Sequence, residues 1–321
     1  MTPPDRSCNP GRPHDAESCT IEKVAVLVNP TAGAGRGAKV AAPALARLRE
    51  RGVDVRELVG TDGPDAARLA TQAVRDGIDA LVVVGGDGLI ALALPALVGA
   101  DTPLGIVPAG TGNDHARAYG LPRDNPKDAA DVIADGHVRA VDVGRIDAAG
   151  TTTYFGAVMA AGFDSLVNDR ANRMRWPRGQ ARYNLATLIE LAHLRPLPFR
   201  LVLAGGTVIE QDLLLAAVGN TSSYGGGMRI CPDADPADGQ LDITVVRAMP
   251  RRRVVRFFPT IFKGTHVQHD GIDTYRTASV HIEAPGIRAY ADGEYVAPLP
   301  VDVSLVPRAL RVLSPAARRT R

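Results

Sequence analysis

The pattern of apolar and polar residues predicts an N-terminal half that alternates strands and helices. Residues 21–29 form a Val-rich apolar run that ends before Pro30, which is typical of a buried parallel strand. Beyond a glycine-rich loop, TAGAGRG, residues 39–51 place apolar side chains at helical spacing up to Gly52. The alternation then repeats, with strands expected at 53–59, 79–84 and 102–107, and helices at 65–76 and from GGDG to about Val98. Strands that alternate with helices indicate an α/β domain with a parallel sheet.

The pattern becomes β-rich beyond about residue 140. Short apolar runs between Gly, Pro and Asp turns predict strands at 141–146, 152–160, 199–203, 207–217, 241–246, 279–284, 288–291 and 301–306. Helical segments are expected at 164–172, at 181–194 and in a short basic stretch at 251–263. We therefore expect four parts: a disordered tail at 1–20, a nucleotide-binding α/β domain at 21–145, a β-rich substrate domain at 146–307, and a segment at 308–321 that returns to the first domain.

Neither a secretory signal nor a membrane span is expected. The first twenty residues are polar and Pro-rich and lack an apolar core. Residues 80–100 are apolar over about the length of a membrane span. They contain Asp87 and Pro95, however, and we interpret them as a buried strand, a glycine turn and a helix.

Charge and composition exclude some partners. Thirty-seven Lys and Arg against 35 Asp and Glu leave a net charge of +2, and aromatic residues make up 4% of the chain. A dedicated nucleic-acid-binding protein usually has a basic excess and aromatic stacking platforms, so no nucleic-acid partner is expected. The three cysteines have no CxxC spacing, which favours reduced thiols in a cytoplasm.

Three glycine-rich loops follow predicted strands: residues 29–33, residues 85–88 (GGDG) and residues 108–114. Glycine lets the backbone approach a ligand closely, and a helix start behind the loop turns N–H groups toward an anion. GGDG matches neither the dinucleotide fingerprint GxGxxG nor the GK[ST] loop, and taken alone it could be a plain turn. Because the carboxyl ends of parallel strands share one edge, the three loops together indicate a phosphate-bearing ligand.

These motifs resemble the diacylglycerol kinase catalytic domain of bacterial lipid kinases, in particular its actinobacterial branch. The resemblance is carried by NPTAG, GGDG and PLGIVPAGTGNDHA, and further along by AAGFDS, GN…YGGG, CPDADPADGQLD and ADGE. It implies an α/β domain with a parallel sheet, like that of NAD kinase and diacylglycerol kinase, followed by a C-terminal β-sandwich. It also implies transfer of the ATP γ-phosphate to the hydroxyl of diacylglycerol, which gives phosphatidic acid.

The resemblance assigns roles to individual residues. It implies that ATP is held by Asn29, Pro30, Thr31, Ala32, Gly33, Thr61, Gly85, Gly86, Asp87, Gly88 and the residues up to Leu92, Thr111 and Asp114. Asp87 and Asp114 would join a network around the nucleotide-bound Mg²⁺. Asp292 of ADGE would be the general base, and Glu294 would share its face if the segment is extended and could orient a cation. Taken alone, ADGE could also be an ordinary Asp-Gly turn.

An acidic turn, DPADGQLD, offers hard oxygen ligands that suit Mg²⁺. The resemblance implies a structural Mg²⁺ held by the carboxylate of Asp238 and the main-chain carbonyls of Asp235 and Gln240. The alternative is an Asp-rich hairpin turn without an ion.

One position departs from the resemblance. Leu89 stands where the family usually has Thr after GGDG, and the Asn-Glu pair often found a little later is absent. The missing hydroxyl would remove one phosphate contact, worth about 1 kcal/mol, and leave the backbone donors in place.

Two basic clusters, residues 170–178 with Arg182 and residues 251–258, combine arginines with Trp or Phe. Such segments suit an anionic membrane surface, which predicts peripheral association with the inner face of the cell membrane, although a solvated helix face is an equal alternative. For His115 a local packing or capping role is expected, and a homodimer is possible. The rival functions are an NAD kinase-like soluble kinase and a non-catalytic lipid- or nucleotide-binding homologue.

Overall fold

A computed structural model describes residues 17–29, 32–174, 176, 185–186, 189–190 and 193–316. The chain divides into two compact units. The first contains Met1–Gly110, Tyr119–Val141 and Ala309–Arg321, and the second contains Thr111–Ala118 and Asp142–Arg308. Two long strands, β6 (His137–Ala148) and β16 (Val301–Leu313), begin in one unit and end in the other.

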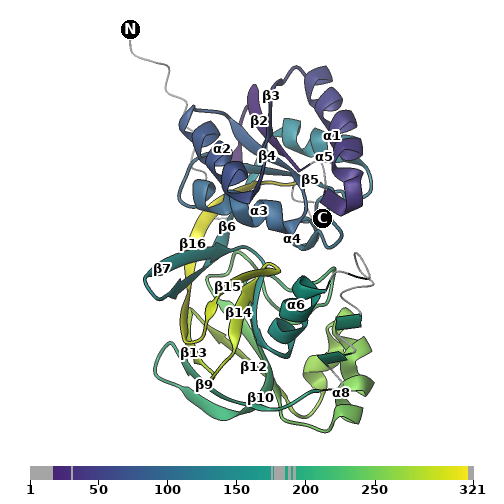
Figure 1. The fold of residues 1–321 in the computed structure, drawn as a ribbon. Coiled ribbons are helices and arrows are strands. Elements are labelled where there is room, and N and C mark those ends of the chain that lie inside the picture. The colour runs from purple at the N-terminus through teal and green to yellow at the C-terminus, as the bar shows by residue number, and fades with distance from the viewer. Residues whose placement is uncertain are drawn as a thin grey trace, which may run out of the picture. The chain divides into compact units, whose positions relative to one another are not determined.

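The first unit is built on a parallel sheet. Its strands are β2 (Lys23–Val28), β3 (Asp54–Val59), β4 (Ala80–Gly85) and β5 (Leu104–Pro108), in the order β5-β4-β2-β3. Helices α1 (Ala32–Glu50) and α5 (Pro126–Asp135) cover one face, and α2 (Gly63–Arg75) and α3 (Asp87–Leu97) lie together on the other (Figure 1). The alternation of strands and helices predicted from the sequence is confirmed.

Apolar side chains on alternate positions of the strands make the core of this unit. Val24, Val26 and Val28 are buried with Leu48 of α1 and Ile133 of α5. Near the chain's end, Val312 of β16 pairs in parallel with Leu104 of β5, which adds a strand to the sheet. The two-residue strand β1 (Glu17–Ser18) pairs with β6.

Helix α5 was not predicted, although its sequence carries recognisable boundaries. The Asn125 side chain caps the start by accepting a hydrogen bond from Lys127 N, Pro126 is the first helical residue, and Gly136 ends the helix at a positive φ of 69°. Those are the preferred residues at a helix start and stop.

The predicted TAGAGRG loop is wrong from Ala32 onward, because α1 begins there rather than at residue 39. Its three glycines each cost about 1 kcal/mol relative to Ala in a helix. Burial of the later turns, through Ala41, Ala44, Leu45 and Leu48, compensates for that cost. The loop after β2 is therefore short, and Ala32 and Gly33 lie at the start of a helix.

The second unit consists mainly of antiparallel strands. A central run of strands has the order β14-β8-β10-β9-β13-β16, with β15 beyond β14, β11 also pairing with β10, β12 with β11, and β7 with β6. Besides β6 and β16, the strands are β7 (Thr151–Phe155), β8 (Val158–Gly162), β9 (Leu197–Leu203), β10 (Val208–Gly219), β11 (Leu241–Arg247), β12 (Ile272–Thr277), β13 (Ser279–Glu283), β14 (Arg288–Ala291) and β15 (Glu294–Pro298). Their inward side chains, among them Phe199, Leu213 and Ile243, form one buried cluster.

Helices of this unit that lie wholly within the described residues include α4 (Asp114–Ala118), α6 (Phe163–Arg173), α8 (Arg251–Phe257) and the 3₁₀ helices η1 (Phe258–Lys263) and η2 (Thr265–Gln268). Most of the helix expected at 181–194 lies outside the described residues. Among the described helices, none is both long and apolar enough to cross a bilayer.

The strand predicted at 152–160 is in fact two strands. The chain bends at Gly156 and Ala157, between β7 and β8. At this bend three consecutive backbone N–H groups donate to the side chain of Asp292. The break between the two strands therefore forms the binding site for that carboxylate. Strands β12 and β15 were also missed.

Candidate active site

The three glycine-rich loops leave the first unit's sheet at one edge. Val28 of β2 pairs with Val84 of β4, and Gly85 of β4 pairs with Pro108 of β5, so all three strands end at the same level. The N–H of Ala109 donates to the Gly85 carbonyl at 2.8 Å, which joins the second and third loops directly. The expected convergence at the carboxyl edge is confirmed.

Gly86 brings the second and third loops close together. A Cβ on Gly86 would lie 3.0 Å from the Gly110 Cα, so only glycine fits without moving the backbone. Gly86 is also the residue before α3, and the described structure shows no side chain capping that helix start. The first N–H groups of a helix have no partner within the helix and attract anions, so the arrangement suits a phosphate group.

The Leu89 side chain packs against Gly85 of the GGDG turn. A Cβ on Gly85 would lie 2.8 Å from a Leu89 methyl group, and the Leu89 side chain is buried. The leucine therefore fills the inner side of the turn with buried apolar surface. It provides no hydroxyl that could contact a phosphate.

The other residues of the first unit that were predicted to contact the nucleotide lie in different local settings. Asn29 directly follows β2 and donates its N–H to the Val84 carbonyl. Thr61 donates both its N–H (3.1 Å) and its hydroxyl (3.3 Å) to the Asp65 carboxylate at the start of α2. Pro30 and Thr31 lie outside the described residues, and Asp87 and Gly88 form the first turn of α3.

Thr111 and Asp114 belong to the second unit, although their motif starts in the first. Asp114 is buried at the start of α4, where its carboxylate accepts hydrogen bonds from the Gly226 N–H (2.7 Å) and the Ser223 hydroxyl (3.3 Å). The YGGG segment thus binds the GTGND segment, a contact that the sequence motifs alone did not indicate.

Asp292 and Gly293 form the tip of the β14–β15 hairpin. Both have positive φ angles, 50° and 87°, as in the two-residue turn that favours Asp-Gly. The Asp292 side chain is only 1% exposed, although its backbone reaches the surface. Its Oδ2 accepts from Gly156 N (2.8 Å), and its Oδ1 accepts from Ala157 N (2.9 Å) and Val158 N (3.2 Å). ADGE is therefore a tight turn and a buried carboxylate at once.

The prediction that Glu294 shares a face with Asp292 is wrong. It assumed an extended segment, in which side chains two residues apart point the same way. The positive φ angles at Asp292 and Gly293 reverse the chain between them, so the Asp292 side chain is buried whereas Glu294 is exposed.

A buried polar network supports Asp292. Asn220 is wholly buried, and its amide donates to the Gly156 carbonyl and the Asp142 carbonyl, both at 2.9 Å. The Asp142 carboxylate accepts from Gly239 N (2.8 Å) and Arg308 N (2.7 Å). His115 is also wholly buried, with its Nε2 3.5 Å from the Asp292 Oδ2. Sequence reasoning missed Gly156, Asn220 and Asp142, and only the GN dipeptide hinted at Asn220.

The acidic turn carries a concentrated negative charge. Burial, helped by the nearby Asp238 and Asp233 and opposed by Arg276, raises the pKa of Asp242 to about 6. Arg276 forms an ion pair with Asp238, whose Oδ1 accepts from Gln240 N. Within the described part of the chain, no group of three or more His, Cys, Asp or Glu side chains could hold a metal.

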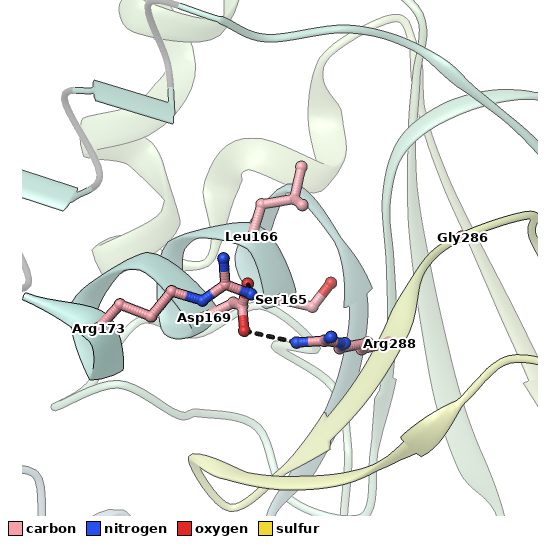
Figure 2. Close-up of a pocket in the computed structure, with 6 residues that line it drawn as sticks. All are labelled: Ser165, Leu166, Asp169, Arg173, Gly286 and Arg288. Atoms are coloured by element: carbon pink, nitrogen blue, oxygen red, sulfur yellow. Dashed lines mark hydrogen bonds and ion pairs between the residues drawn. The ribbon is translucent and has the colours of Figure 1, made fainter.

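A polar pocket of about 210 Å³ lies between α6 and β14 in the second unit (Figure 2). Asp169 lies at its centre and pairs with Arg288 and Arg173, both at 2.7 Å. Leu166 of α6 contributes an apolar side chain to the lining. Two guanidinium groups against one carboxylate leave the pocket with a net positive charge.

Comparisons with known proteins agree with this geometry. Residues 23–146 match the family model of the diacylglycerol kinase catalytic domain, and residues 157–314 match the YegS C-terminal NAD kinase beta sandwich-like domain. A solved structure from Bacillus anthracis superposes with a TM-score of 0.78 at 26% identity and covers 93% of this chain and 97% of its own. An NAD kinase from Archaeoglobus fulgidus, solved with ATP, has the same fold at a TM-score of 0.51 and 15% identity, covering 92% and 95%.

The fold has the architecture shared by diacylglycerol kinases and NAD kinases, and the match to the diacylglycerol kinase catalytic domain makes the chain a kinase. A protein of Mycobacterium tuberculosis named diacylglycerol kinase is 57% identical over 92% of this chain and 96% of its own length. One of the same name from Bacillus subtilis is 27% identical over 92% and 97%. The chain belongs to the diacylglycerol kinase family. The expected α/β domain and β-sandwich are confirmed.

Proposed function

We propose that this protein transfers the γ-phosphate of ATP to the hydroxyl of diacylglycerol and so produces phosphatidic acid. The observation that supports this best is the 57% identity, over nearly the whole chain, with a relative named diacylglycerol kinase. The first unit adds a suitable phosphate site, since three loops meet at the carboxyl edge of its sheet.

In this proposal the phosphates of ATP lie against backbone N–H groups at the loop around Gly86 and the start of α3. Asn29, Ala32 and Gly33 of the first unit would complete the contacts. Mg²⁺ bound to the nucleotide would neutralise part of the charge that develops on the triphosphate, and the residues of the loops would position the phosphates. The backbone donors act without any side chain, so they are unaffected by Leu89.

Asp292 serves as the general base. The lipid hydroxyl oxygen forms a bond to the γ-phosphorus, the bond between that phosphorus and the bridging oxygen breaks, and ADP leaves. The hydroxyl proton passes to Asp292. Two backbone donors occupy Oδ1 and one occupies Oδ2, and a carboxylate offers about four lone-pair positions, so the proton goes to Oδ2.

A positively charged side chain already occupies the turn at which a structural Mg²⁺ was expected, at Asp235, Asp238 and Gln240. The guanidinium of Arg276 already pairs with Asp238 and lies 3.6 Å from Asp242, so it supplies the positive charge that the turn attracts. As arranged, the turn does not fit a metal on Asp238.

The function is tested by incubating the purified chain with labelled ATP and Mg²⁺ and a panel of acceptors. Diacylglycerol, ceramide and a sphingosine-like base are presented in mixed micelles, and NAD in solution. We expect label in phosphatidic acid. Label in NADP would support the NAD kinase alternative, and nucleotide binding without phosphorylation of any acceptor would support the non-catalytic one.

Membrane contact is proposed for the second of the two basic clusters. Val255 and Phe262 are 52% and 51% exposed beside the exposed Arg252, Arg256 and Lys263 of α8 and η1. In the first cluster, Arg170 and Arg173 are paired with Glu190 and Asp169. Trp176 is exposed, and Arg175, Arg178 and Arg182 lie outside the described residues.

Reversing charge on α8 is expected to weaken binding to anionic vesicles. Each basic residue near an anionic surface contributes about 1 kcal/mol, so the double variant Arg252→Glu, Arg256→Glu should lose at least about tenfold in affinity for phosphatidylglycerol vesicles. Co-sedimentation measures this. The matched control, Arg75→Glu with Arg123→Glu, changes two exposed arginines of the first unit by the same charge. Equal losses in both variants would contradict the assignment of this surface.

Restoring a hydroxyl at Leu89 is expected to tighten ATP binding. Leu89→Thr should lower the KM for ATP about fivefold, because one added phosphate hydrogen bond contributes about 1 kcal/mol. Leu89→Val has the same shape without the hydroxyl, so it separates this gain from the lost packing over Gly85. Identical KM values for the Thr and Val variants would show that the hydroxyl does not reach the nucleotide.

A further inference from the structure

We propose that the pocket between α6 and β14 binds the headgroup of a lipid phosphomonoester, the class to which phosphatidic acid belongs. The pocket is lined by residues of α6, by Arg288 of β14 and by Gly286 just before that strand (Figure 2). Arg288 is the first residue of β14, and Asp292 follows the last, which places them about 13 Å apart along the strand. The pocket is therefore a site apart from the proposed base, and binding to it requires no turnover.

Two guanidinium groups reach the pocket from different elements. Arg173 of α6 pairs with Oδ2 of Asp169, and Arg288 of β14 pairs with Oδ1, each at 2.7 Å (Figure 2). Two positive charges against one negative charge give the lining side chains a net charge of +1. Each arginine pairs with Asp169 through one nitrogen, and a guanidinium has five N–H donors, so both arginines keep donors for an anion.

The ion pairs of Asp169 add little to the stability of the fold, because they are open to water. The side chains of Arg173 and Arg288 are 70% and 48% exposed, and exposed ion pairs are weak. Since both arginines pair with the same carboxylate, Asp169 instead orients the two guanidinium groups toward one place. Groups that are oriented before a ligand arrives lose less freedom when it binds.

Two tyrosines restrain Arg288 further. Its guanidinium carbon lies 5.8 Å from the centre of the Tyr295 ring, a cation–π contact. The Tyr290 ring meets Tyr295 edge-on, and the Tyr290 hydroxyl donates to Asp169 at 3.4 Å. The arginine, the two rings and the carboxylate therefore form one connected set, which keeps the guanidinium at the pocket.

The size and the edge of the pocket favour a lipid over free phosphate. Its volume of about 210 Å³ is below the roughly 300–1,000 Å³ of pockets that enclose drug-sized ligands, so it suits a headgroup without acyl chains. Leu166, 40% exposed, belongs to the lining, and Tyr295, 52% exposed, lies beside Arg288. Exposed apolar side chains next to a phosphate site suit the glycerol and ester carbons of a lipid, which inorganic phosphate lacks.

The donors favour a phosphomonoester over a phosphodiester. A phosphomonoester carries a charge of about −1.5 to −2 at pH 7 and presents three acceptor oxygens. A phosphodiester has a single negative charge and two such oxygens. Two guanidinium groups that approach from different elements match the larger charge and the third oxygen, since arginine forms its strongest hydrogen bonds to ionised oxygens.

Isothermal titration with dihexanoyl phosphatidic acid, kept below its micelle concentration, measures the binding without a membrane. We expect this lipid to bind at least about tenfold more tightly than inorganic phosphate, because it adds apolar contact. It should also exceed dihexanoyl phosphatidylglycerol, a phosphodiester, by at least about tenfold. Equal affinity for inorganic phosphate would assign the pocket to the free anion, and equal affinity for phosphatidylglycerol would exclude selection of a monoester. Either result overturns the proposal.

Variants of the two arginines locate the binding. Arg288→Gln and Arg173→Gln should each weaken the binding of dihexanoyl phosphatidic acid by at least about tenfold, because each removes a charged donor. Arg173 is an exposed side chain of a helix, so its variant leaves the sheet unchanged. Arg200→Gln is the matched control, since Arg200 is a similarly exposed arginine of the second unit that pairs with Glu283. If both arginine variants bind the lipid as the control does, the pocket is not the site and the proposal is wrong.

The titration contains no nucleotide, so its result is independent of the proposed function. A chain that binds the lipid as expected but phosphorylates no acceptor would refute the proposed function and leave this site in place. A chain that phosphorylates diacylglycerol, but whose affinity for phosphatidic acid does not depend on Arg173 or Arg288, would refute this site and leave the function in place.

Discussion

Asp292→Asn is expected to lower kcat for lipid phosphorylation by about 10²- to 10⁴-fold, the range that a positioned general base contributes. The variant is also expected to be less stable, because an amide cannot accept all three backbone hydrogen bonds. Its Nδ2 would face the Gly156 N–H, and an unsatisfied buried donor costs about 1–3 kcal/mol. The carboxylate therefore stabilises the β14–β15 hairpin against the bend between β7 and β8, in addition to its proposed role as the base.

The two effects are separated by measuring turnover and thermal unfolding on the same preparation. Activity is compared at a temperature at which circular dichroism shows both proteins folded. Asp302→Asn is the matched control, since Asp302 is an exposed acid of the second unit that pairs with His281 at the surface. A kcat within about tenfold of wild type would contradict the assignment of the base.

Gly86→Ala is expected to weaken ATP binding by about tenfold to a hundredfold. The new methyl group would lie 3.0 Å from the Gly110 Cα, so the two loops must move apart by a few tenths of an ångström or more. Small displacements of this kind are costly where donors are aimed at a ligand. The variant should still fold, because Gly86 has an extended conformation that alanine adopts easily.

Isothermal titration with a non-hydrolysable ATP analogue measures this loss. Gly63→Ala is the matched control, because a Cβ on that glycine of α2 meets only the Leu92 methyl groups, at ordinary contact distances. Equal affinities of Gly86→Ala and wild type would show that the nucleotide does not use the contact between these loops.

Local patterns determined much of the first unit. Apolar runs such as 79–84 and helical spacing in 65–76 predicted strands and helices within a few residues of those observed. The convergence of the loops that follow the parallel strands could then be predicted, because the carboxyl ends of parallel strands lie at one edge of the sheet. The start of α1 was misplaced, since glycine is permissive and its local preference does not reveal a helix stabilised by later turns.

The second unit was harder because its key contacts are distant in sequence. The bend at Gly156 is 136 residues from Asp292, and Asn220 lies 64 residues from Gly156. Hydrogen bonds over such separations leave no periodicity in the chain. His115 shows the same limit: the sequence suggested packing or capping, whereas the fold places its imidazole against Asp292.

The sequence by itself determined the parallel sheet, the three glycine-rich loops at its edge and the family to which the chain belongs. These features depend on local residue preferences and short motifs. Only the tertiary structure decided what surrounds Asp292: that the Asp-Gly turn buries its carboxylate, that three backbone N–H groups bind it, and that Glu294 points elsewhere. The reason is physical, because a buried carboxylate is stabilised by whichever donors the folded chain brings to it, and strand pairing selects those donors.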